Sequence, residues 1–226
     1  MGNLNKRSVY EVTRLCGLMP IDGIWDKPAW DIVRPLELTS FMGVIPVFRP
    51  EVRAKMMYDE ENLFVIFRVD DRFVRCVTTK PNGPVWEDSC VEFFFSPDND
   101  FPEKYFNLEI NCGGTPLMHY NIVPRKEFIE VSYDDILKIQ IAHSLPDLTD
   151  PEIVEPVIWT VEYKIPLSIL RKYSPVTKPQ PGVEWKANFY KCAEKNSNPH
   201  FITWAVVQNN IPDFHLPQFF GTLGFL

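Results

Sequence analysis

Apolar and polar residues alternate along most of the chain, and this period of two predicts β-strands rather than helices. Residues 52–58 read VRAKMMY and residues 62–71 read NLFVIFRVDD, with the turn-forming DEEN between them. Two alternating runs joined by a short polar turn are typical of a β-hairpin. The apolar run CVEFFFSP at residues 90–97 predicts a further strand.

The run YFNLEINCGG, residues 105–114, separates an apolar face from a polar one. The apolar set is Phe106, Leu108, Ile110 and Cys112, and the polar set is Asn107, Glu109 and Asn111. Successive side chains of a strand point to opposite faces, so this pattern is typical of a strand with one face in a core.

Five more stretches continue the pattern, and polar, proline-bearing links separate the strands. They are residues 136–143, 157–165, 184–194, 201–205 and 221–226. Many short strands of this kind predict an all-β fold, an antiparallel β-sandwich with immunoglobulin-like layers.

Helix signals are short. In DKPAWDIV, Asp26 is a candidate N-cap with Pro28 just inside the helix, and PLSILRKY, which starts at Pro166, has the length of two turns. The acidic segment 143–156 predicts a surface loop. Because no repeat, linker or change of composition is present, residues 1–226 are expected to form a single domain with one or two short helices.

Composition fits a globular domain with stiff loops. Hydrophobic residues make up 45% of the chain, and 21 prolines stand against 10 glycines. Proline has no N–H group to donate to the hydrogen bonds of a sheet, so the prolines are expected in turns and edge strands. The net charge of -7 and the lack of a basic stripe argue against a nucleic-acid partner. The charge favours a neutral or protein ligand, or serves solubility alone.

The five cysteines form no C-x-x-C pair and are odd in number, which disfavours a zinc knuckle or a disulfide scaffold. Cys90 and Cys112 lie in apolar strands and are expected to be buried. No apolar run approaches the ~18 residues of a membrane span. The N-terminal MGNLNKRSVYEV lacks an apolar signal core. The compartment stays open: cytoplasmic as the sequence stands, extracellular or periplasmic if a leader has been removed.

Residues 85–98, VWEDSCVEFFFSPD, place a tryptophan beside acidic residues. A glycosidase needs two carboxyl groups flanking a bond, roughly 5–9 Å apart. Asp88 and Glu92 share a parity on a strand and form one candidate pair. We expect Asp88 instead to hydrogen-bond loop backbone, as acids near turns do.

Acidic loops offer oxygen ligands of the kind that calcium prefers. The candidate ligands are Asp70 and Asp71 in one loop, Asp98 and Asp100 in another, and Asp22 and Asp26 near the N-terminus. Acidic loop residues are also commonly solvated turns. The four histidines are dispersed and predict no transition-metal cluster.

Most tryptophans lie in strands, and Trp159, Trp185 and Trp204 are expected to pack in the core. Trp86 differs, because it follows the turn-rich TTKPNGPV and precedes a strand. A tryptophan in such a place can stack on the apolar face of a pyranose while polar neighbours bind hydroxyl groups. A purely structural role for Trp86 stays open.

Five stretches together resemble a known family. They are IDGIWDKPAW, YDEENLFVIFRVDD, VWEDSCVEFFFSPDND, WTVEYKIPLSIL, and ITWA followed by PDFHLPQFFGTLGF. In order and spacing they are similar to family 9 carbohydrate-binding modules, of the DOMON-like β-sandwich group, over about residues 18–226. The resemblance implies a sandwich that binds sugars and holds structural calcium, with no organic cofactor.

The resemblance also implies a site in which two aromatic rings enclose a terminal sugar. Trp86 falls on the first ring position and Phe214 on the second, where the family more often has tryptophan. Glu92 would accept hydroxyl groups, and His215 would add a partner. Asn107 falls where the family pattern has an arginine.

The sequence therefore predicts non-catalytic binding of the end of an oligosaccharide or polysaccharide, in polysaccharide degradation. Two alternatives stay open: a haem-binding redox domain of DOMON type, and a glycoside hydrolase-associated enzyme that uses Asp88 and Glu92. Met and His can ligate haem, but Met118 and His119 are adjacent and point to opposite faces of a strand. The oligomeric state is also open.

Overall fold

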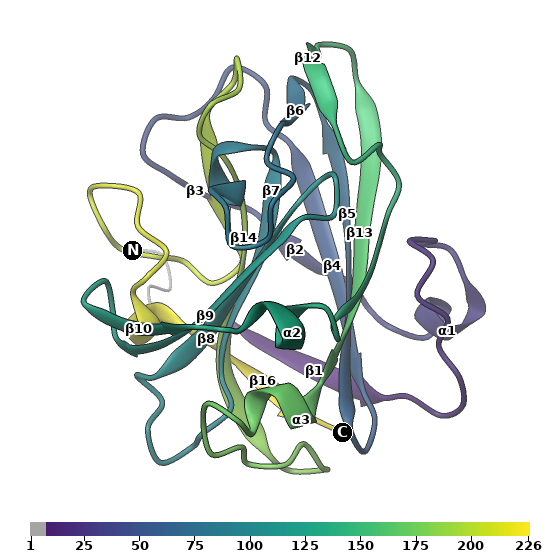
Figure 1. Ribbon diagram of the computed structural model, residues 1–226, viewed down its shortest axis with the longest axis vertical. Helices are drawn as coiled ribbons and strands as arrows, with labels where there is room; N and C mark the ends of the chain where they lie inside the picture. Colours follow the sequence, from purple (N-terminus) through teal and green to yellow (C-terminus); the bar gives the residue numbers. More distant parts are fainter. Residues whose placement is uncertain (1–7) are drawn as a thin grey trace, which may run out of the picture.

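The computed structural model describes residues 8–226, and it shows two packed layers of strands (Figure 1). The first layer contains β3 (Ser40–Met42), β7 (Cys90–Ser96), β8 (Tyr105–Asn111), β9 (Pro116–Val123), β10 (Glu127–Glu130), β14 (Glu184–Ala193), β15 (His200–Thr203) and β16 (Gly221–Phe225). The second contains β2 (Leu36–Leu38), β4 (Glu51–Tyr58), β5 (Asn62–Asp71), β11 (Gln140–His143) and β13 (Val157–Pro166). Residues 1–7, the start of the segment MGNLNKRSVYEV that was analysed for a signal core, lie outside the described residues.

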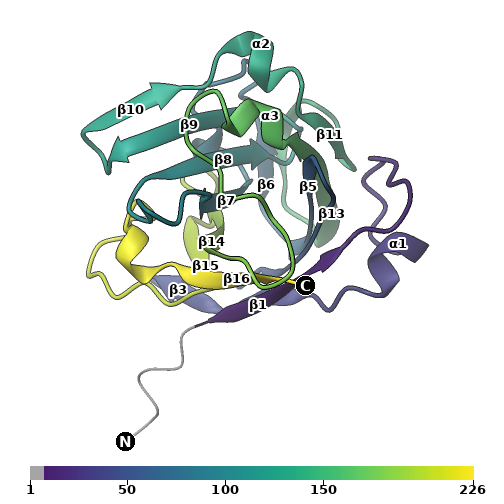
Figure 2. The same cartoon turned by 90° about the horizontal axis from the view of Figure 1, so that it is seen from below.

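The first layer follows the order β10-β9-β8-β7-β14-β16, and the second follows β11-β13-β5-β4. Strand β1 (Val9–Arg14) joins them, because its first half pairs in parallel with β16 and its second half with β4. Figure 2 shows the layers curling around the core, with β1 and β16 along one side. The predicted all-β sandwich is confirmed, with two parallel pairings at the junction of otherwise antiparallel layers.

Aromatic rings fill the space between the layers. Phe93 stacks on Phe95 and on Phe189, with ring centroids 4.5 and 4.7 Å apart. Phe67 reaches across from β5 to lie 5.9 Å from Phe189. Trp159 is fully buried, as expected. This burial of large apolar surface is the main stabilising contribution to the fold.

The other two tryptophans expected in the core differ from each other. Trp185 is fully buried. Trp204 is only partly buried, and it packs edge-on against Phe189 at 5.9 Å. Cys90 and Cys112 are both buried, as their apolar strands predicted.

Within residues 8–226, three one-turn helices and two 3-10 turns connect the strands. They are α1 (Pro28–Asp31), α2 (Tyr133–Ile136), α3 (Leu167–Leu170), η1 (Val85–Glu87) and η2 (Pro217–Phe219). The predicted N-cap Asp26 is wrong: Pro28 is the first helical residue, so Lys27 takes the cap position, and no side chain caps the helix. Helix α3 also has one turn rather than the expected two.

The segment 143–156 is not entirely a loop. It contains β12 (Thr149–Ile153), which forms a two-stranded ribbon with β6 (Val74–Cys76). Most residues of β12 are polar, so its own sequence does not indicate a strand. It forms a strand because it pairs with β6, which is distant in sequence. No helix among the described residues is long and apolar enough to cross a membrane.

A buried lysine fastens the segment before α1 to β13. Lys27 Nζ lies 2.8 Å from Asp22 Oδ1 and 2.7 Å from Glu162 Oε1. Trp30 Nε1 and the Gly23 amide donate to the same Glu162 carboxylate, each at 2.8 Å. The ammonium group therefore already pairs with Asp22, which the sequence offered as a candidate metal ligand.

Candidate functional site

The outer face of β7, β8 and β9 carries a row of polar side chains. Cross-strand register places Glu92 opposite Glu109, and Asn107 opposite His119. Residues of the other parity on these strands form the core between the layers. The alternation seen in residues 105–114 thus directs its polar set outward.

Two segments cover this face and leave a cavity of about 310 Å³. One is the β9–β10 hairpin, and the other is the chain before η2. The five residues predicted to bind sugar all line this cavity: Trp86, Glu92, Asn107, Phe214 and His215. They come from η1, two strands and the C-terminal segment, so the fold brings together residues distant in sequence.

Two aromatic side chains form part of the cavity wall. Trp86 is half-buried, and its carbonyl accepts hydrogen bonds from the Glu194 amide at 3.3 Å and from Cys192 Sγ at 3.5 Å. Phe214 stacks on Tyr190 with centroids 4.1 Å apart, which leaves it only 7% exposed. Trp86 therefore offers more free ring surface to a ligand than Phe214.

An amide network runs along the floor of the cavity. Asn121 Nδ2 donates to Asn107 Oδ1 at 2.6 Å, and Asn107 Nδ2 donates to Glu109 Oε1 at 2.8 Å. The other oxygen of Glu109, Oε2, is buried and has no hydrogen-bond partner in the protein. Buried polar atoms normally have partners, so this oxygen marks a place where a ligand can bond.

Glu92 and Glu109 share the floor as cross-strand neighbours. Burial, reinforced by the nearby charge of Glu109, raises the pKa of Glu92 well above its usual value. Burial also raises the pKa of Glu109 to about 7, although the Asn107 hydrogen bond and Arg125 oppose the shift. This shift favours the protonated form of Glu92, and a protonated carboxyl group can donate as well as accept a hydrogen bond.

The C-terminal side of the cavity is held by polar contacts. His215 Nδ1 lies 2.7 Å from Tyr105 Oη, and burial lowers the pKa of His215 to about 4. Arg125 in the β9–β10 turn pairs with Asp213 at 2.5 Å, and the same carboxylate accepts the His215 amide. This contact ties the hairpin to the C-terminal segment beside a neutral imidazole.

Asp88 lies outside the cavity. Its Oδ1 accepts the Val77 amide at 3.1 Å, and its Oδ2 accepts the Thr78 amide at 2.9 Å and Asn111 Nδ2 at 3.0 Å. The expected backbone role is confirmed. The alternative catalytic pair of Asp88 and Glu92 is contradicted, because both Asp88 oxygens are occupied by internal donors.

The candidate calcium ligands Asp70 and Asp71 already have basic partners. Arg68 Nη1 lies 2.8 Å from Asp70 Oδ2. Lys191 Nζ, fully buried, lies 3.4 Å from Asp71 Oδ2, and Trp159 Nε1 donates to that oxygen at 3.3 Å. These contacts satisfy the Asp71 carboxylate without a metal.

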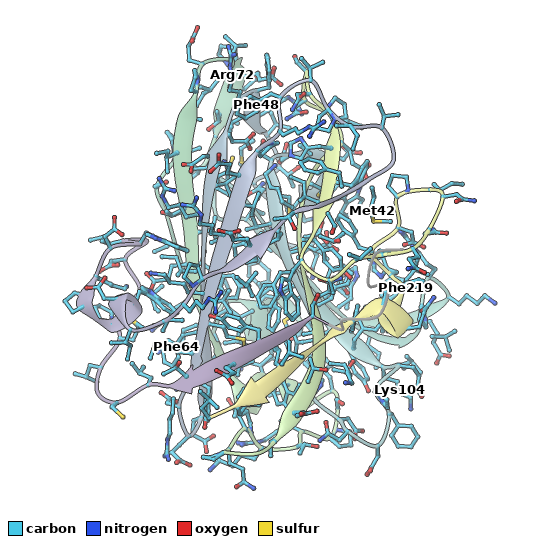
Figure 3. The ribbon with its side chains drawn as sticks, turned by 180° about the vertical axis from the view of Figure 1, so that it is seen from behind. Met42, Phe48, Phe64, Arg72, Lys104 and Phe219 are labelled. Carbon is cyan, nitrogen blue, oxygen red and sulfur yellow. The ribbon has the colours of Figure 1, made fainter. Side chains whose placement is uncertain are left out.

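The second acidic loop is far from the first. Figure 3 places Arg72, next to Asp71, and Lys104, close after Asp100, at opposite ends of the molecule. Asp98 Oδ1 accepts the Asp100 amide at 3.0 Å, which closes the loop on itself. Calcium takes 6–8 oxygen ligands. The four aspartates cannot belong to one such site, and calcium binding at either loop alone stays a prediction.

One group of potential transition-metal ligands borders the cavity. The ligand atoms of Cys90, Glu92 and Cys192 lie within 4.8 Å of one another, and all three residues are buried. Burial raises the pKa of Cys90 to about 12, and it also raises the pKa of Cys192. Metal binding needs thiolates, so the group fits a hydrogen-bonded thiol pair better than a metal centre.

The haem alternative gains no support from these strands. Met118 is fully buried in the core, whereas His119 lines the cavity on the opposite face and stacks on Phe128 at 4.6 Å. The two side chains cannot ligate one iron, as their adjacent positions predicted.

Several cavity residues were missed by sequence reasoning about the site. Glu109 was detectable, because it shares the strand parity of Asn107. Asn121 follows only from the register of β8 and β9, and Arg125 and Glu194 carry no local signal at all.

The chain belongs to carbohydrate-binding family 9, whose sequence profile matches residues 42–225. Carbohydrate binding is the activity of that family, and the β-sandwich with a polar and aromatic cavity is consistent with it. No curated protein sequence shows significant similarity to this chain.

Solved structures are similar over nearly the whole chain. A protein from Bacteroides uniformis ATCC 8492, described as a "putative carbohydrate-binding protein", is 29% identical with a TM-score of 0.86, over 98% of this chain and 100% of its own. A family 9 module from Caldicellulosiruptor kristjanssonii in complex with cellotriose is 17% identical with a TM-score of 0.66, over 96% and 93% of the two chains. The glucose complex of such a module has the same identity and TM-score, over 97% and 96%.

Proposed function

We propose that this chain binds the terminal sugar of an oligosaccharide or polysaccharide, without catalysis, in the cavity beside Trp86 and Phe214. One observation carries the proposal: a half-buried tryptophan and several buried polar side chains converge on one cavity of about 310 Å³. This volume is at the lower end for small-molecule sites, which favours one end unit of a glycan over an extended chain.

The cavity offers the two kinds of contact that a sugar requires, namely stacking on an apolar ring and hydrogen bonds to hydroxyl groups. Trp86 supplies a flat apolar surface for the C–H face of a sugar ring. Glu109 Oε2 accepts a hydroxyl hydrogen, and the Glu92 carboxyl group accepts one or, when protonated, donates one. The Nε2 atom of neutral His215 donates or accepts according to its tautomer, because Nδ1 bonds to Tyr105. Phe214 adds a second ring of smaller free area. The cellotriose and glucose complexes of the Caldicellulosiruptor module support glucose-like units as first candidates.

The arrangement of acids argues for binding rather than bond cleavage. A glycosidase places its two carboxyl groups on either side of the scissile bond. Glu92 and Glu109 are instead cross-strand neighbours on one floor, and Glu92 Oε1 accepts a hydrogen bond from Cys192 Sγ at 3.0 Å. A role in polysaccharide degradation would then be to hold the substrate for a separate enzyme.

Calorimetric titration tests the proposal. Glucose, cellobiose and xylobiose are each compared with their borohydride-reduced forms, in which the reducing-end unit is an open-chain alditol and any non-reducing ring stays closed. Binding is expected for the unreduced sugars, and Trp86→Ala should weaken it by about 1–3 kcal/mol, as for other anchor aromatics. Trp25→Ala, which changes a half-buried tryptophan outside the cavity, serves as the matched control.

Each result has a definite meaning. Equal affinity of wild type and Trp86→Ala would move the ligand to another part of the surface. Equal affinity for sugars and their reduced forms would exclude recognition of the reducing end. Absence of binding across the panel would contradict the sugar class as chosen.

A further inference from the structure

The lining of the cavity contains more acidic than basic side chains. Glu92 and Glu109 are 2% and 5% exposed, and Glu194 lies at the rim. Arg125 is the one arginine or lysine among the lining residues, all of which are described, and its guanidinium is paired with Asp213 at 2.5 Å. Three carboxyl groups therefore face the cavity without a basic partner.

The contacts of these acids within residues 8–226 include no ion pair with Glu92 or Glu109. Glu92 Oε1 accepts only a thiol hydrogen bond, from Cys192 at 3.0 Å, and a thiol is a weak donor. Glu109 Oε1 accepts the neutral amide of Asn107, while Oε2 is buried without a partner. At the rim, Lys195 pairs with Glu87 at 2.7 Å rather than with Glu194. No ion pair within the described residues reaches Glu92 or Glu109.

Nearby titratable groups do not supply the missing positive charge. Burial lowers the pKa of His119, and it lowers the pKa of His215 to about 4, so both imidazoles are neutral at neutral pH. Burial also raises the pKa of Glu194, and the nearby charge of Glu87 raises it further. An isolated buried carboxylate is unfavourable unless a proton or a cation compensates it.

We propose that the cavity prefers sugars that carry an ammonium group, so that its best ligand is the end of an amino-sugar glycan. The inference rests on the proposed function and specifies its ligand class. The ammonium would donate to the free Oε2 of Glu109 and lie next to Glu92, with Glu194 adding negative charge at the rim. A hydroxyl group at the same place offers a hydrogen bond without the charge, and an acetamido group adds bulk and no charge.

Three β-1,4-linked disaccharides test the inference, because they differ only at C2. Cellobiose has a hydroxyl group there, di-N-acetylchitobiose an acetamido group, and the fully deacetylated chitosan disaccharide an ammonium group. Calorimetry at neutral pH is expected to show the deacetylated disaccharide binding about tenfold tighter than the other two, the difference between a charge-assisted and a neutral hydrogen bond.

Charge-neutral variants locate the preference within the cavity. Glu109→Gln keeps the acceptor for Asn107 and removes the charge, so the ratio of affinities for the deacetylated disaccharide and cellobiose should fall toward one. Glu194→Gln should lower the ratio by a smaller factor and covers the case in which Glu109→Gln does not fold. Glu127→Gln makes the same charge change on the exposed β10 strand outside the cavity and should leave the ratio unchanged.

The outcomes separate this inference from the proposed function. If cellobiose binds as tightly as the deacetylated disaccharide, the ammonium preference is wrong and sugar binding stands. If the ratio survives both Glu109→Gln and Glu194→Gln, the assigned acids are wrong. If none of the three disaccharides binds, the inference and the proposed function both fail.

Discussion

Glu109 is the residue on which both the proposed ligand contact and the pH dependence of stability depend. Strand parity turns it away from the core, the Asn107 amide fixes one of its oxygens, and the other oxygen is left without a partner. The same burial that prepares it for a ligand makes its charged form unfavourable in the free protein.

This burial gives Glu109 a measurable effect on stability. Its pKa is about 7 in the folded protein and about 4.3 in an unfolded chain. Between these values the folded state keeps a proton that the unfolded state releases, so the stabilising contribution of Glu109 falls as pH rises and is lost above the folded pKa. The size of the full change is about 3–4 kcal/mol.

Urea unfolding of wild type and Glu109→Gln from about pH 4 to about pH 8 measures this contribution. The variant should gain about 3–4 kcal/mol relative to wild type over that range, because glutamine has no proton to release. A difference between the two proteins that does not change with pH would contradict the account of Glu109.

Asp88 stabilises the start of β7 rather than binding a ligand. Asp88→Asn would turn one of its acceptor oxygens into a donor that faces backbone N–H groups, and each buried group left without a partner costs about 1–3 kcal/mol. We expect a loss of about 2 kcal/mol in the free energy of unfolding. The control Asp100→Asn changes an exposed side chain that makes no hydrogen bond with residues 8–226. It should change the free energy of unfolding by less than about 0.5 kcal/mol.

At the scale of the element, strand pairing was largely predictable and connections were not. The hairpin at residues 52–71 follows from two alternating runs and the turn DEEN between them. Strand β12 escaped prediction because its pairing depends on the edge of β6 rather than on its own pattern. The failed N-cap at Asp26 has a similar origin, since the segment is held by long-range contacts of Lys27 with β13.

The Lys27 contact makes a prediction about the N-terminal segment. Lys27→Met leaves Glu162 buried without its cation, and breaking a buried pair in this way costs about 3–5 kcal/mol. Lys164→Met, on the same strand β13 but half-buried and unpaired among the described residues, should change stability by less than about 1 kcal/mol. Equal losses in the two variants would show that the pair contributes nothing specific.

At the scale of the whole molecule, the cavity depends on contacts that no local pattern encodes. The outward polar face of β8 was visible in the sequence, and the resemblance placed Trp86 and Phe214 near it. The covering hairpin and the Arg125–Asp213 contact arise only when the chain closes on itself. The charge imbalance of the cavity follows from that closure, since the segments that meet there bring a single guanidinium to several acids.

The most direct test of the account is a crystal structure of the chain with cellobiose or the deacetylated disaccharide bound. The account predicts one terminal ring against Trp86, with a ligand donor about 2.6–3.2 Å from Glu109 Oε2. A sugar bound elsewhere, for example in the second hollow beside Phe41 and Arg49, with no sugar beside Trp86, would contradict it.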